Sequence, residues 1–100
     1  MKDFLFIFGY EAPWELKSNE EFGSDFESSD AIWVVAESED EALDVGRKYA
    51  KTIVDSIFQK ENTDYDGWEY TNYANWIEKK PLERYSRLAL ETLPRIEKKS

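Results

Sequence analysis

The segment Phe4–Phe8, with the sequence FLFIF, is apolar at every position, so the strand that it predicts is apolar on both faces. A strand with one face in water would alternate apolar and polar residues. A second segment, Ala31–Ala36 (AIWVVA), shares this property and is rich in β-branched residues, which favour strands. We therefore expect two interior strands, each covered on two sides or on one side with a loop over the other.

The clearest helix start follows the second strand. Ser38 is a good N-cap residue, and Glu41 three residues later completes a capping box. The next residues predict one long helix with an apolar face made of Ala42, Val45, Tyr49, Ala50, Ile53, Val54 and Ile57. We expect Ile53 to be a core residue. Gly46 lies within the apolar arc, and we attribute it to a close approach between helix and sheet, because a glycine there costs about 1 kcal/mol relative to alanine.

The segment Asp66–Ile77 (DGWEYTNYANWI) is rich in aromatic residues, and its periodicity fits either a strand or a helix. Glycine and asparagine disfavour a helix, so we predict a third strand that is irregular around residues 72–75. Trp76 and Ile77 are expected to line the core. Trp68 and Tyr70 are the members expected to form an exposed aromatic surface, because large amphipathic rings are rarely all buried in a small domain.

A last helix is predicted between Pro81, which suits a first turn, and Pro94, which ends it. Its expected buried stripe consists of Leu82, Tyr85, Leu88, Ala89 and Leu93. Residues 95–100 are expected to fray.

These elements predict one α+β domain over residues 1–100, which is a usual length for a single domain. The expected order is strand, long loop, strand, helix, strand, helix, with two helices packed on a small sheet of three or four strands. The second strand, the long helix and the third strand are compatible with a right-handed parallel crossover unit.

The composition excludes several kinds of chemistry. The chain has no cysteine and no histidine, which rules out disulfides, thiolate and histidine-based catalysis, and the usual ligands of zinc and copper. The polar segment Gln59–Gly67 resembles a calcium loop only in part, because Tyr73 stands where the bidentate glutamate is required. Asp64 and Asp66 offer a carboxylate pair for acid-base chemistry, but no desolvating surroundings are evident. We expect no cofactor and no metal.

The connection between the first two strands, Gly9–Asp30, is 22 residues long and carries seven acidic residues and one basic residue. Connections between strands are usually much shorter. Pro13 is able to start a short helix here, although its apolar pattern is poor. Acidic residues and large aromatic residues alternate in this segment, a combination suited to protein binding, and the candidate binding residues are Trp14, Glu20, Glu21, Asp25 and Glu27. A structural cap over one face of the sheet is the alternative interpretation.

The net charge is −9, and all of it arises in residues 1–50. Such a chain lacks the clustered positive face that direct nucleic-acid binding requires. No apolar run is long enough to span a bilayer, and the N-terminal run lacks the features of a signal peptide, so we expect a soluble cytoplasmic protein.

Two functions remain open on this evidence. One is a non-enzymatic protein-binding module, of the inhibitor, immunity-protein or adaptor type, that docks a basic partner. The other is a small-molecule binder or enzyme with an aromatic-lined pocket and carboxylates as its acid-base groups. The position of the acidic side chains, either spread over an outer surface or converging in a pocket, distinguishes the two.

Overall fold

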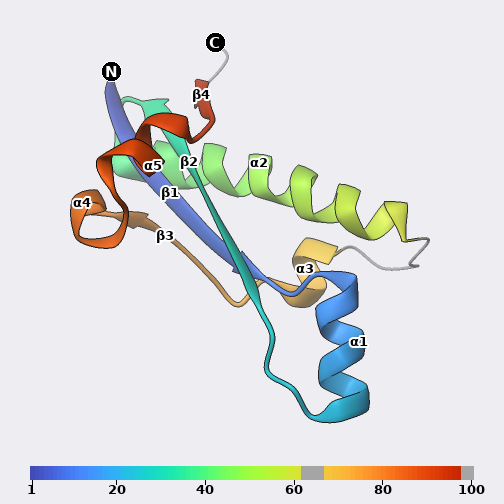
Figure 1. Cartoon of the computed structure of the whole chain (residues 1–100). Coiled ribbons are helices and arrows are strands. Elements are labelled where there is room, and N and C mark those ends of the chain that lie inside the picture. Colours follow the sequence, from blue (N-terminus) through green and yellow to red (C-terminus); the bar gives the residue numbers. More distant parts are fainter. Residues whose placement is uncertain (62–66, 98–100) are drawn as a thin grey trace.

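The computed structural model describes residues 1–61 and 67–97, which form an α+β fold with helices packed on a four-stranded mixed sheet (Figure 1). In chain order the elements are β1 (Lys2–Tyr10), α1 (Pro13–Phe22), β2 (Ser28–Ala36), α2 (Glu39–Lys60), α3 (Gly67–Thr71), β3 (Ala74–Glu78), α4 (Pro81–Arg84), α5 (Arg87–Thr92) and β4 (Arg95–Glu97). The predicted class is therefore confirmed, with the larger of the two expected strand counts. The calcium-like stretch around Asn62, Asp64 and Asp66 lies outside the described residues.

The sheet has the strand order β3-β1-β2-β4, so β1 and β2 are its interior strands. β1 pairs antiparallel with both β2 and β3, and every residue from Leu5 to Tyr10 is buried. This arrangement confirms the interior position expected from the apolar runs. β2 and β3 are parallel to each other with β1 between them, so α2 lies in a parallel crossover connection, as expected.

Helix α2 covers one face of the sheet and begins after Ser38, whose hydroxyl accepts a hydrogen bond from the Glu41 amide. Its buried residues are spaced four apart, at Ala42, Gly46, Ala50, Val54 and Phe58. This row is inclined to the helix axis, which suits a helix that crosses the strands diagonally (Figure 1). The predicted core position of Ile53 is wrong: Ile53 is only partly buried, and Val54 beside it is fully buried.

Gly46 has the packing role expected of it. A Cβ atom at this position would lie 2.5 Å from Cγ of the fully buried Phe6 ring. Real Cβ atoms do not approach a ring that closely, so only glycine lets α2 lie directly on β1 here.

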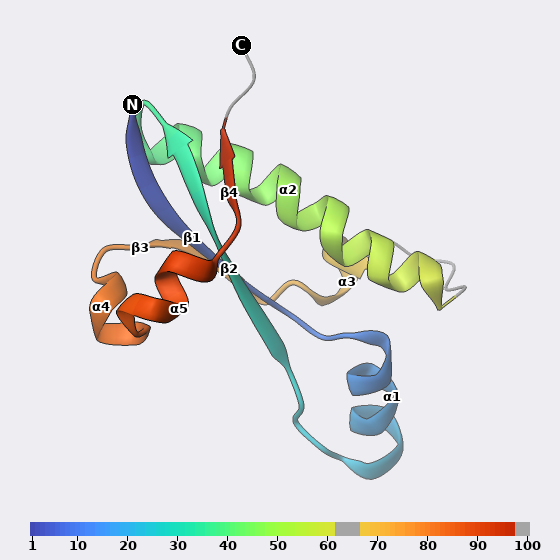
Figure 2. The same cartoon turned by 45° about the horizontal axis from the view of Figure 1, so that its top comes forward.

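The opposite face of the sheet is partly covered by α4 and α5 (Figure 2). The single helix predicted between Pro81 and Pro94 is wrong, because Tyr85 is extended and Ser86 caps a second helix by accepting a hydrogen bond from the Ala89 amide. The predicted buried stripe is correspondingly wrong at Leu82 and Leu88, which are exposed, and Leu90 is the buried residue instead. Residues 95–97, expected to fray, pair parallel with β2 as β4.

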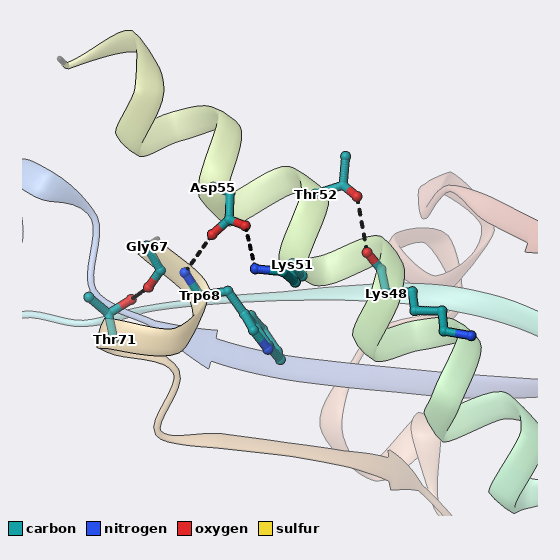
Figure 3. Close-up of polar contacts among 7 residues, drawn as sticks. All are labelled: Lys48, Lys51, Thr52, Asp55, Gly67, Trp68 and Thr71. Atoms are coloured by element: carbon teal, nitrogen blue, oxygen red, sulfur yellow. Dashed lines mark hydrogen bonds and ion pairs between the residues drawn. The ribbon is translucent and has the colours of Figure 1, made fainter. Parts of the chain in front are cut away.

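The segment predicted as a third strand divides into a helix and a strand. Gly67–Thr71 forms α3, and only Ala74–Glu78 forms the strand β3. The carboxylate of Asp55 on α2 accepts a hydrogen bond from the Trp68 amide at 2.9 Å, which provides the first turn of α3 with an acceptor (Figure 3). This contact from a distant residue favours the helix over the predicted strand.

Candidate functional site

Helix α1 stands at the end of the β1–β2 hairpin that lies farthest from α4 and α5 (Figure 2). The segment predicted as a long loop therefore contains a ten-residue helix. Its first residue is Pro13, which the sequence had indicated as a possible helix start. Proline suits that position because its fixed backbone angle is helical and its missing amide would be unpaired there anyway. The poor apolar pattern is explained by the small part of α1 that contacts the core: Leu16 packs against it.

Glu15 fastens α1 to the hairpin. Its side chain is only 2% exposed, and its Oε1 atom accepts hydrogen bonds from the Ala12 amide at 2.8 Å and from the Ser28 hydroxyl at 2.7 Å. The sequence interpretation counted Glu15 among the acidic residues of the segment and missed this role. A glutamate as the third helical residue is one half of a capping box, but the other half is usually Ser or Thr, and Ala12 occupies that position.

The turn after α1 is folded back onto the helix by Asn19. The Asn19 side chain donates to the Phe26 carbonyl and accepts from the Phe26 amide, both at 2.9 Å. Gly23 ends the helix in the left-handed conformation at φ 66°, with its amide bonded to the Asn19 carbonyl. These contacts hold the Phe26 ring against the Trp14 ring, with 5.7 Å between the ring centroids.

The aromatic pair is exposed, and acidic residues lie close to it in the sequence. Trp14 is 61% exposed and Phe26 is 48% exposed, and Phe22 at the end of α1 is 77% exposed. The acidic binding residues predicted from the sequence are all exposed on α1 or on the segment after it; they are Glu20, Glu21, Asp25 and Glu27. We call the surface formed by Trp14, Phe22, Phe26 and these four acidic residues the α1 surface.

Acidic residues at this end of the sheet help to raise the pKa values of two tyrosines, Tyr73 and Tyr10. The Tyr73 ring lies over Gly9, and its hydroxyl donates to the Ser28 carbonyl at 3.3 Å. Burial, followed by the charges of Glu27, Glu15 and Glu11, raises the pKa of Tyr73.

Tyr10 donates a hydrogen bond to the carboxylate of Asp30 at 3.0 Å. Burial, followed by the charge of Asp30, raises the pKa of Tyr10 to about 12. Both phenols therefore resist a further negative charge at this end of the sheet.

Trp68 and Tyr70 do not form the exposed aromatic surface that was predicted, because only Tyr70 is exposed. Tyr70 is 59% exposed, whereas Trp68 is partly buried and meets Phe8 edge-on at a centroid distance of 6.0 Å. Figure 3 shows the Trp68 side chain pointing from α3 towards β1. Trp76 and Ile77 pack against the core on opposite faces of the sheet, in agreement with the expectation that they line it.

In the part of the chain that the structure describes, neither of two surface hollows includes an acidic residue of the α1 surface in its lining. Both hollows combine aromatic and acidic residues. One, between α2 and β4, is lined in part by Asp44, Tyr49 and Glu97. The other lies at the start of β1 and the end of β3, where Asp3, Trp33 and Glu78 contribute to its lining. Its carboxylates already have partners: Asp3 pairs with Arg95, and Glu78 accepts from the Trp76 indole. Hydrogen bonds from the Trp76 indole and the Lys80 amide hold the pKa of Glu78 below its usual value. Glu78 is therefore ionised near neutral pH and is not suited to donate a proton.

Within residues 1–61 and 67–97, no three acidic side chains come together as a metal site would require. No helix in this part of the chain is both long enough and apolar enough to cross a membrane. Comparisons with protein-family models, with curated proteins and with solved structures found no match.

Proposed function

We propose that this protein is a non-enzymatic protein-binding module that docks a basic partner through the α1 surface. The observation that carries the proposal is the Trp14–Phe26 pair, which Asn19 holds in place while both rings remain exposed. An exposed aromatic pair with no role in the core, and with its conformation already set, has the properties of a binding anchor.

The surrounding charges point to the chemistry of the partner. Four exposed carboxylates on α1 and on the segment after it attract a basic surface over distance and raise the association rate. On contact, an arginine or lysine of the partner is able to lie over the Trp14 ring, where cation–π attraction adds to the ionic contacts. Charge therefore acts mainly on association, and the aromatic rings act mainly on dissociation.

The test uses basic peptides of defined length, an oligo-arginine and an oligo-lysine, with an oligo-glutamate as the control ligand. Association and dissociation rates are measured at low and moderate salt. One variant removes four charges from the site and consists of Glu20→Gln, Glu21→Gln, Asp25→Asn and Glu27→Gln. Its matched control removes four exposed charges elsewhere and consists of Glu37→Gln, Asp40→Asn, Glu83→Gln and Glu91→Gln.

We expect the site variant to slow association by about tenfold and to flatten its salt dependence, with a much smaller effect of the control. Trp14→Ala should mainly speed dissociation, by an amount that corresponds to about 2 kcal/mol for a hot-spot residue. Leu88→Ala, at another exposed apolar position, serves as its control. Equal behaviour of the two four-charge variants contradicts the proposal. Unfolding of Trp14→Ala would instead identify α1 as a structural cap.

A further inference from the structure

Strand β4 leaves one edge of the sheet open. It pairs with β2 on one side, and no other strand among residues 1–61 and 67–97 pairs with its outer side. The Pro94 carbonyl bonds to the Trp33 amide of β2, and backbone groups of successive strand residues point to opposite sides. Ile96 therefore faces β2, and the amide and carbonyl groups of Arg95 and Glu97 face the open edge. Open edges of this kind are templates for pairing with another strand.

A groove lies beside this edge, under α2. It has a volume of about 660 Å³ and is lined by Asp44, Val45, Lys48, Tyr49, Thr52, Ile96 and Glu97. Val45, Tyr49 and Ile96 are partly buried against the core, so the floor of the groove is apolar. Figure 2 shows α2 behind β4 on this side of the molecule, while α1 lies at the other end.

The charges at the edge complement a second copy of the same edge. β4 has the charge order Arg95, Ile96, Glu97. If two such strands pair antiparallel about a two-fold axis at Ile96, Arg95 of each copy lies opposite Glu97 of the other. The same register makes these residues the hydrogen-bonded pairs, because their backbone groups already face outward. It also brings the two Ile96 side chains together as the non-hydrogen-bonded pair, over the apolar groove.

We propose that two copies of this chain associate through antiparallel pairing of their β4 strands, forming one continuous eight-stranded sheet. The two α2 helices then lie on the same face, one on each side of the axis. Asp44 and Lys48, an ion pair at 3.0 Å within α2, run along the groove in opposite order in the two copies, so each positive charge faces a negative one. Arg95 already pairs with Asp3, and its guanidinium has enough donors to serve a second carboxylate.

The experiment measures the molecular mass by sedimentation equilibrium over a wide range of protein concentration. We expect the wild type to pass from monomer to dimer as concentration rises, with concentration-dependent protection of the Arg95 and Glu97 amides in hydrogen exchange. Arg95→Glu and Glu97→Arg each place like charges opposite one another and should weaken the dimer by about tenfold or more. Mixed together, these two variants restore both opposite-charge pairs, so they should form a heterodimer.

A backbone variant and a charge control complete the test. Glu97→Pro removes an outward amide that β2 does not use, so it should weaken the dimer while leaving the β2–β4 pairing in place. Glu83→Arg changes the charge equally at an exposed position on α4, which lies apart from β4 (Figure 2), and should have little effect. A wild type that stays monomeric over the whole range overturns the proposal. So does a dimer that resists Glu97→Arg and Glu97→Pro, or a pair of charge variants that fails to combine although each variant is folded by circular dichroism.

Discussion

The hydroxyl of Ser28 donates a hydrogen bond to the buried carboxylate of Glu15 at 2.7 Å, and this contact joins the first turn of α1 to the start of β2. The two residues are thirteen positions apart; Trp14 directly precedes Glu15, and Phe26 lies two positions before Ser28. Glu15 therefore determines where the α1 surface is held relative to the sheet.

Glu15→Ala should destabilise the protein by about 1–3 kcal/mol, because it leaves the Ala12 amide and the Ser28 hydroxyl without their acceptor in a buried place. Urea denaturation measures the loss. Glu20→Ala on the exposed side of α1 is the matched control and should change the free energy of unfolding by less than about 0.5 kcal/mol. An equal effect of the two substitutions would show that Glu15 does not fasten the helix.

Gly46→Ala should destabilise the protein by about 1–3 kcal/mol, although alanine is the better helix former, because its Cβ would overlap the Phe6 ring. The double variant Gly46→Ala with Phe6→Leu should lose less than the sum of the two single changes, since the smaller side chain relieves the overlap. Thermal and urea unfolding provide the values. A stabilising effect of Gly46→Ala alone would contradict the close approach of α2 to β1.

Val54→Ala should cost about 2 kcal/mol, because Val54 is fully buried in the row of α2 that contacts the sheet. Ile53→Ala removes more atoms from a partly buried position and should nevertheless cost less, about 1 kcal/mol or below. The comparison of the two denaturant midpoints tests the orientation of α2. The reverse order of the two losses would mean that Ile53 faces the core after all.

Alkaline pH should destabilise the fold through Tyr10. The pKa of Tyr10 is raised from 10.0 to about 12 in the folded protein, so the unfolded chain loses this proton first. The stabilisation that protonated Tyr10 provides is complete below pH 10, and it is lost as the pH rises towards the pKa of Tyr10 in the folded protein. Tyrosinate absorbance and unfolding midpoints over this range test the shift. Asp30→Asn should lower the pKa of Tyr10 because it removes a neighbouring charge, and ionisation of the wild-type residue at its ordinary pKa would contradict the assignment.

Asp55 should stabilise the fold on the acid side. Burial opposes its ionisation, but hydrogen bonds from Lys51 and from the Trp68 amide hold the pKa of Asp55 below its usual value (Figure 3). The stabilisation is present above the ordinary pKa of an aspartate and is lost as the pH falls through the lowered one. Asp55→Asn should therefore flatten the acid side of the stability profile. A profile identical to that of the wild type would show that Asp55 does not hold α3.

The central part of the fold could be predicted from the sequence because its signals are local. The segments Phe4–Phe8 and Ala31–Ala36 are apolar at odd and even positions, which only a strand covered on both faces requires, and both are interior strands. Ser38 and Glu41 are one helical turn apart, so their residue types alone indicated where α2 begins.

Within α2 the apolar arc included both Ile53 and Val54, and the pattern could not tell which of them faces the sheet. The inclination of the helix across the strands decided it, because the contacting row then follows every fourth residue. The same limit applied to residues 67–71, where periodicity fitted helix and strand alike. The hydrogen bond from the Trp68 amide to the Asp55 carboxylate of α2 favours the helix.

By itself, the sequence determined the α+β class, the two interior strands, the start of α2 and the absence of thiol and imidazole chemistry, since each depends on composition or on residues within one turn of each other. Only the tertiary structure decided the burial of Glu15, the pairing of β4 and the exposure of the Trp14–Phe26 pair. Each of these depends on a partner seven or more residues away, such as Ser28, β2 or Asn19, and the energy of a contact is gained only once the folded chain brings its two sides together.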